Sequence, residues 1–237
     1  MAFAYSPKIV TDGLVFAADA ANKKSYPGSG TTWSDLVNGN DGTLTNGPTF
    51  DSGNGGSIVF DGSNDYGSIS SILTSRPFSI NFIVNFSSLD NWQTILGQDT
   101  SASTVFGRFY LQKTHPSQAI SPRINNTVGL ALINANLNQV YCYDPNVVET
   151  NTWYNYCLTV SSTNITLFKN GQQVNTISNS DNLSTPTGNV LICAGYYNNN
   201  IVDFVNGKLP LLNIYNRALT STEVTQNYNA LKSRFGL

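Results

Sequence analysis

The acidic side chains are the first to test for catalysis, because hydrolysis of a glycosidic bond needs a pair of carboxyl groups on facing positions. The chain has only two glutamates, Glu149 and Glu223, and no two of its twelve aspartates stand within two residues of each other on an expected central strand. The lone histidine, His115, precedes Pro116 in a polar segment without a nucleophile motif, which indicates a surface loop. The sequence therefore predicts no enzymatic activity.

Oxygen ligands for a hard cation occur in two short turns. Asp61, Asn64 and Asp65 share one turn, and Asp19 stands near Asn22 in another. Calcium takes six to eight such oxygens. Asp and Asn are also common in turns, because their side chains bond to their own backbone. We favour the turn interpretation, keep a calcium site as the alternative and expect no other cofactor.

Aromatic residues beside amide side chains are typical of a sugar site. The best such segment is Tyr196–Tyr197 followed by Asn198–Asn200, and two further segments contain Trp92 and Tyr143. Tyrosines of a β-sandwich also serve as core and rim residues whose hydroxyl reaches water. The same asparagine-rich loops would suit adhesion to a protein surface, so both uses stay open.

The overall composition indicates one globular domain and gives no reason to expect nucleic acid or a membrane as a partner. Of the 237 residues 40% are hydrophobic and only 11% are charged, while 31 are asparagine. A net charge of −2 without a basic patch gives no reason to expect nucleic acid. No apolar run is long enough for a membrane span, and the start has no signal-peptide pattern. The unclustered cysteines are expected to be buried free thiols: Cys142, Cys157 and Cys193.

Short alternating segments separated by turns predict the strands that position these residues. Five apolar residues alternate with polar ones over 78–86, so they project from one face of a long strand. Asn170-Gly171 between two alternating segments predicts a type I′ hairpin. Pro210 predicts that the last strand, over 209–215, is an edge strand or contains a bulge.

One amphipathic helix is predicted at the C-terminal end. Thr220 and Glu223 have capping-box spacing, and Gly236 suits the stop. An apolar stripe recurs at i, i+4, i+7 and i+11, which predicts that the helix docks through Val224, Tyr228, Leu231 and Phe235.

Several motifs together carry a family resemblance: IVTDGLV (9–15), KSYPGSGTTW (24–33), TLTNGP (43–48), FDGSNDY (60–66), IYNRALTSTEV (214–224) and NYNALKSRFG (227–236). The chain resembles the laminin-G-like jelly-roll domains of the concanavalin A-like lectin/glucanase superfamily. The residues that make up these motifs are similar to those of stand-alone virion proteins of tailed, marine bacteriophages. The resemblance implies an all-β fold, a two-sheet antiparallel jelly-roll sandwich with a short C-terminal α-helix.

The resemblance also sets the functional expectation. Residues 13–237 are expected to form the domain and residues 1–12 an extended docking arm with Tyr5, Pro7 and Ile9 as contacts. We expect a non-enzymatic virion module, made in the host bacterial cytoplasm, that decorates the capsid or another particle surface through capsid or tail proteins. The alternative is a phage lectin or adhesin that binds host-surface polysaccharide. A distant alternative is an inactive relative of the glucanases.

Overall fold

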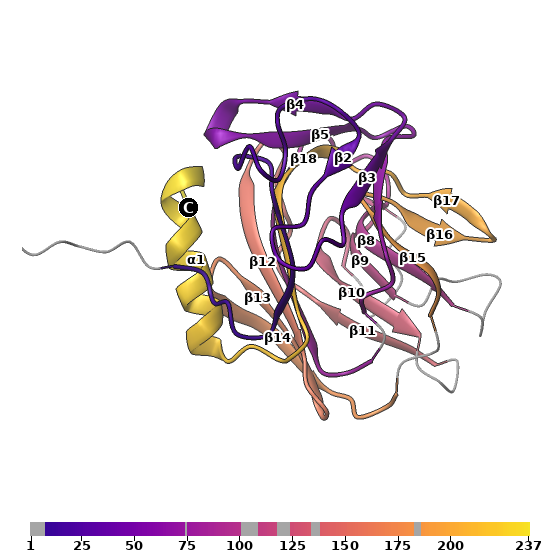
Figure 1. Cartoon of the computed structure of the whole chain (residues 1–237). Helices are drawn as coiled ribbons and strands as arrows, with labels where there is room; N and C mark the ends of the chain where they lie inside the picture. Colours follow the sequence, from indigo (N-terminus) through magenta and orange to yellow (C-terminus); the bar gives the residue numbers. More distant parts are fainter. Residues whose placement is uncertain (1–7, 74, 101–108, 118–123, 134–137, 183–185) are drawn as a thin grey trace, which may run out of the picture.

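Two antiparallel β-sheets pack face to face, and a single helix lies outside one of them (Figure 1). The computed structural model describes residues 8–73, 75–100, 109–117, 124–133, 138–182 and 186–237. Sheet A runs in the order β14 (Gln172–Ser178), β13 (Asn164–Lys169), β12 (Trp153–Val160), β7 (Phe78–Phe86), β18 (Asn206–Tyr215), β5 (Ser57–Asp61) and β4 (Thr49–Asp51), and β1 (Leu14–Asp19) also pairs with β18. Sheet B runs in the order β11 (Gln139–Tyr143), β10 (Val128–Ile133), β9 (Phe109–Lys113), β8 (Gln93–Thr100), β15 (Pro186–Ile192), β6 (Tyr66–Ile69), β3 (Gly42–Thr45) and β2 (Thr32–Trp33).

Three smaller elements complete the described chain: a hairpin of β16 (Gly195–Tyr197) and β17 (Asn200–Val202), a 3₁₀ turn η1 (Gly53–Gly55), and helix α1 (Ser221–Phe235). The structure confirms the predicted all-β, two-sheet antiparallel sandwich with one C-terminal helix. The predicted hairpin turn is also present, because Asn170 and Gly171 both have positive φ between β13 and β14.

Strand β7 supplies one wall of the core, as its alternation predicted. Its five inward side chains are at most 3% exposed and belong to the main apolar cluster: Phe78, Ile80, Phe82, Val84 and Phe86. The polar residues between them are buried too, which alternation alone does not predict. Ser79, for example, donates to the carbonyl of Arg217 and accepts from the N–H of Leu219. The segment leading into α1 therefore covers this part of the outer face of sheet A.

The strand that contains Pro210 is central, so the expectation of an edge strand was wrong and that of a bulge was right. β18 lies between β7 and β5, and its pairing with β7 shifts register between Lys208 and Leu211. Proline cannot donate to a ladder, and a register shift is where a central strand tolerates it. The Pro210 carbonyl still accepts the N–H of Ala20 at 2.8 Å.

Helix α1 begins and ends as the sequence predicts. Thr220 and Glu223 form the capping box, and Gly236 caps the C-terminus with φ +68°. The docked face includes the four predicted residues, two of them less deeply buried than expected. Val224 and Phe235 are buried, whereas Tyr228 and Leu231 are half-buried, with Leu231 packed against the Phe235 cluster and Tyr228 against Gly171. A polar residue, Asn227, is buried at the middle of the helix face that contacts the sheet. It follows the buried Val224 at i+3, and residues three apart lie on the same face of a helix.

Side-chain hydrogen bonds fix the helix at its middle and at both ends. Asn227 accepts the N–H of Val10 at 2.8 Å and donates to the Tyr215 hydroxyl at 3.0 Å. Arg217 pairs with Glu223 at 2.6 Å near the N-terminus. Arg234 pairs with Asp19 at 2.8 Å near the C-terminus. These bonds attach α1 to the outer face of sheet A.

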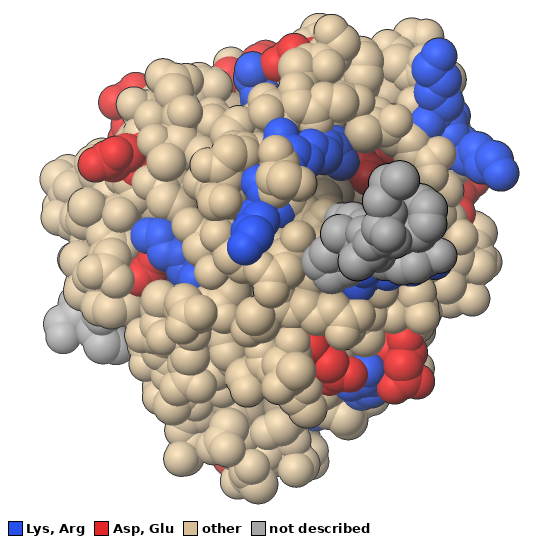
Figure 2. All heavy atoms as spheres, turned by 90° about the vertical axis from the view of Figure 1, so that its left-hand side faces the viewer, with Lys and Arg blue, Asp and Glu red and all other residues tan. Residues whose placement is uncertain are grey.

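Charged side chains are sparse on the face that carries α1 (Figure 2). They form small, scattered groups on a mostly uncharged surface, and no large patch of one sign is visible from this side. Within the described part of the chain, no helix is long and apolar enough to cross a membrane.

Candidate functional site

The β16–β17 hairpin places a tyrosine and a group of amides at an exposed tip. Asn198 and Asn199 both adopt left-handed backbone, with φ +48° and +58°, as a tight hairpin turn requires. Asparagine tolerates that conformation better than most residues. Tyr197, beside the turn, is 45% exposed, and Asn198–Asn200 are all exposed. The turn therefore presents an aromatic ring and several amides in one place.

The base of this hairpin is anchored to the outer face of sheet B. The Tyr110 hydroxyl of β9 donates to the main-chain carbonyl of Tyr196. Two glycines permit the close approach: a Cβ on Gly97 would lie 2.8 Å from the Gly195 Cα, and one on Gly195 would lie 2.9 Å from the Thr94 hydroxyl. The hairpin is thus joined directly to β8 and β9.

Next to the hairpin, large and small residues alternate across sheet B. Strand register places Gly97, Tyr110, Ala131 and Tyr141 in one row, and Thr94, Gln112, Gly129 and Tyr143 in the next. A Cβ on Gly129 would lie 2.6 Å from the Tyr143 ring, so the ring rests on the glycine. Tyr143 is only 5% exposed, and its hydroxyl accepts from Gln112 at 2.7 Å. Proposed from the sequence as a sugar contact, Tyr143 is therefore a packing residue in this structure.

Trp92 lies in a loop that a buried lysine holds in place. The Lys113 ammonium donates to the carbonyls of Leu89 and Asn91 at 2.8 and 2.5 Å, and burial lowers its pKa to about 8. The half-buried Trp92 ring contacts His115, with ring centres 6.3 Å apart. Two residues further along the chain is Thr94, which touches the base of the hairpin. Trp92 therefore immediately precedes β8, the strand on which the base of the hairpin rests.

Asp203 is a site residue that the sequence did not single out. It follows β17 in left-handed backbone with φ +57°, and its carbonyl accepts the N–H of Thr94 at 2.8 Å. The residue is half-buried, and this burial raises the pKa of its carboxyl group to about 6. The neighbouring Thr94 hydroxyl is fully buried and has no hydrogen-bond partner. No local pattern around Asp203 signals this, because it results from the hairpin folding back onto β8.

The proposed calcium ligands act as turn and ion-pair groups. The Asp61 carboxylate accepts the N–H groups of Ser63, Asn64 and Asp65 at 2.8, 3.2 and 3.4 Å, which lowers its pKa. Burial and the Asp61 charge raise the pKa of Asp65. Asp19 is neutralised by Arg234. Among the described residues, no three His, Cys, Asp or Glu side chains cluster as metal ligands. These residues do not fit a bound calcium ion.

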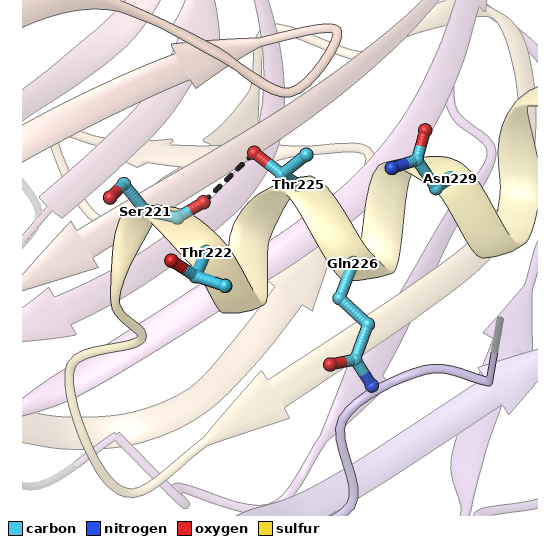
Figure 3. Close-up of a pocket in the computed structure, with 5 residues that line it drawn as sticks. All are labelled: Ser221, Thr222, Thr225, Gln226 and Asn229. Atoms are coloured by element: carbon cyan, nitrogen blue, oxygen red, sulfur yellow. Dashed lines mark hydrogen bonds between the residues drawn. The ribbon is translucent and has the colours of Figure 1, made fainter.

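The described part of the N-terminal arm is bound to the chain's own helix. Val10 is 7% exposed, and its carbonyl accepts from the Tyr215 hydroxyl. Gln226 donates to the carbonyl of Lys8 at 2.8 Å, beside an open hollow on α1 (Figure 3). Ile9, which stands between Lys8 and Val10 in the chain, is half-buried. Two of the predicted docking contacts, Tyr5 and Pro7, lie outside the described residues.

The residues tested for catalysis have other surroundings. Glu223 is held in the helix cap by Thr220 and Arg217, which lowers its pKa to about 2. Glu149 is exposed in the loop before β12. The His115 ring accepts the N–H of Ser117 at Nδ1. None of these contacts joins two carboxyl groups into an acid–base pair.

Solved structures of other proteins share this fold at low sequence identity. Domain 4 of AbnA, an extracellular arabinanase of Geobacillus stearothermophilus solved with arabinotriose, has a TM-score of 0.70 at 16% identity, covering 91% of this chain and 98% of that one. Trypanosoma rangeli sialidase has a TM-score of 0.63 at 14% identity, covering 95% and 33%. The receptor-binding domain of botulinum neurotoxin type G has a TM-score of 0.61 at 15% identity, covering 92% and 51%.

This chain therefore spans about a third of the sialidase chain and half of the neurotoxin chain. A search of curated protein sequences gave no significant match. The family model described as the concanavalin A-like lectin/glucanases superfamily matches residues 60–225, which include most strands of both sheets and the start of α1. The chain belongs to the concanavalin A-like lectin/glucanases superfamily.

Proposed function

We propose that this chain is a non-enzymatic binding module that recognises polysaccharide through the β16–β17 hairpin. The exposed Tyr197 ring beside the amides of Asn198–Asn200 is the observation that carries the proposal. A sugar site needs an aromatic surface and polar groups of fixed geometry. The left-handed turn and the Tyr110 anchor supply that rigidity.

Two further observations support the choice of ligand. A domain of the same fold was solved with arabinotriose, and another is a receptor-binding domain. The hairpin itself has no Lys, Arg, Asp or Glu within 195–202. A neutral glycan is therefore the ligand that binds here without desolvating an ion.

For the cellular setting we propose the surface of a tailed phage particle. The motifs similar to phage virion proteins support this, as does a charge-poor surface that can hydrogen-bond to a capsid or tail protein. Mass spectrometry of purified particles tests the location, because copy number separates a capsid decoration protein from a fibre tip. Absence of the chain from the particles would contradict it.

The binding proposal is tested with immobilised bacterial polysaccharides. Tyr197→Ala should weaken binding about tenfold, equivalent to ~1.4 kcal/mol, because it removes the exposed ring and leaves the hairpin anchor intact. Tyr228→Ala is the matched control, since it truncates a half-buried tyrosine on α1. Equal binding by wild type and Tyr197→Ala would contradict the proposed contact, and glycan hydrolysis by the wild type would contradict the non-enzymatic assignment.

A further inference from the structure

Strand β14 is a long, uncharged free edge. Among the described strands it pairs only with β13, at one end of sheet A. Its seven residues, Gln172–Ser178, include no proline and no charged side chain. At the far ends of the sheets, β4 has three residues and β2 has two. Edge strands are usually short, charged or interrupted by proline, because an open edge invites another strand. The second half of β14 contains neither a charged side chain nor a proline.

The hydrogen-bonding groups of this edge can be assigned from its register. Asn179 donates its N–H to the carbonyl of Thr163 at 2.8 Å, so Asn179 is directed at β13. Hydrogen-bonded and non-bonded pairs alternate in an antiparallel ladder. Thr176 and Ser178 therefore direct their N–H and C=O groups away from the sheet. The register shift in this pair lies between Leu167 and Phe168, toward the hairpin turn, and leaves this stretch regular.

The same stretch is complementary to itself. Two copies can pair antiparallel about a two-fold axis at Ile177, which places Thr176 opposite Ser178 of the second copy and Ile177 opposite its equivalent. All outward N–H and C=O groups then meet a partner, giving about four hydrogen bonds. Side chains match as well, because Ile177 faces the core, whereas Thr176 faces outward beside Thr166 at 2.9 Å.

The surface next to this edge is open and carries one acidic and one basic side chain close together. A hollow of about 420 Å³ adjoins the end of β14 and is lined by Thr163, Asn164, Ser178, Asn179, Ser180 and Asp181. Asp181 is the charged residue of this lining, and Arg76 beside it donates to the Asn179 side chain at 3.0 Å and to the Asp181 carbonyl at 2.8 Å. No like charges therefore face each other across the Thr176–Ser178 pairing, and a second copy can approach without burying an unpaired ion.

We propose that the chain forms a symmetric dimer by pairing β14 edge to edge, which joins sheet A of two copies into one continuous sheet. The occupant of the edge is a second copy because the pairing is self-complementary at every position from Thr176 to Ser178. The dimer does not depend on the polysaccharide site, which lies on sheet B.

Sedimentation equilibrium of the purified chain tests the dimer. We expect twice the chain mass of 25.7 kDa at high concentration and dissociation on dilution. Thr176→Lys and Thr176→Glu should each be monomeric, and an equimolar mixture of the two should recover the dimer. Thr176→Val, which keeps the size and adds no charge, is the matched control and should remain dimeric.

A backbone variant keeps the test decisive if the charged variants fold poorly. Thr176→Pro removes an N–H that makes no bond to β13, so it should give a folded monomer. A wild type that is monomeric at all concentrations up to about 1 mM, near 4 kcal/mol of association, would overturn the proposal. A dimer that persists in Thr176→Pro, or a Lys–Glu mixture that stays monomeric, would overturn it too.

Discussion

Replacing Asp203 with Asn should stabilise the protein at neutral pH. The carboxyl group has a pKa of about 6 instead of its ordinary 3.8, because burial disfavours the charged form. When folding raises the pKa of a carboxyl group, the group destabilises the folded state. This loss of stability is absent below the unfolded pKa and complete above the folded pKa. Asparagine keeps the shape, suits the left-handed backbone at φ +57° and carries no charge.

The magnitude follows from the difference between the two pKa values. At about 1.4 kcal/mol per pKa unit, a rise from 3.8 to about 6 corresponds to about 3 kcal/mol, fully expressed above pH ~7. Urea unfolding of wild type and Asp203→Asn at pH 4, 5, 6 and 7 measures it. We expect nearly equal free energies of unfolding at pH 4 and a growing advantage for the variant as the pH rises.

Asp61→Asn serves as the contrasting control. Three backbone N–H groups stabilise the charged form of Asp61 and lower its pKa, so this variant should be less stable than the wild type by an amount that is complete above about pH 5 and stays constant up to pH 7. If the difference between wild type and Asp203→Asn were the same at pH 4 and pH 7, the Asp203 carboxyl would not be buried as described. The hairpin base would then not shield this carboxyl group from water.

Four further predictions concern the helix, its cap and the core. Phe235→Ala should cost about 3 kcal/mol in thermal or urea unfolding, because its buried ring packs 4.9 Å from Trp153, whereas Leu231→Ala should cost only about 1. Glu223→Gln should cost about 2 kcal/mol at neutral pH, and the wild-type advantage, complete above pH 4.5, should vanish as the pH falls through about 2. Thr94→Val should be neutral or stabilise by about 1 kcal/mol, since the hydroxyl has no partner, and a clear loss of stability would reveal one. The native protein should not react with a thiol reagent until it unfolds, because burial raises the pKa of Cys142 to about 12 and also those of Cys157 and Cys193.

Local patterns predicted the elements whose cause is local. The alternation over 78–86 predicts a strand because side chains of an extended chain alternate between two faces. Asn170-Gly171 predicts its turn because both residues accept positive φ, and Thr220 with Glu223 predicts the helix start because the cap bonds close within four residues. Together with the family motifs, these signals were enough for the two-sheet fold.

The candidate site was only partly predictable. The sequence identified Tyr197 and its amides, since an aromatic residue beside a turn is visible locally. It gave no sign that Tyr143 rests on Gly129 or that the half-buried Asp203 is bonded to β8 through its main chain. Both contacts join segments far apart in the chain, so their geometry depends on strand order and register.

The sequence by itself determined the strand-rich domain, the helix with its caps, the free cysteines and the shortage of carboxylates for catalysis. Tertiary structure alone decided which side chains meet. It made the Pro210 strand central, buried the polar Asn227 on the inward face of the helix, and paired Asp19 with Arg234. The physical reason is that propensity and periodicity act over a few residues, whereas burial, ion pairing and pKa depend on neighbours that only the packed sheets bring together.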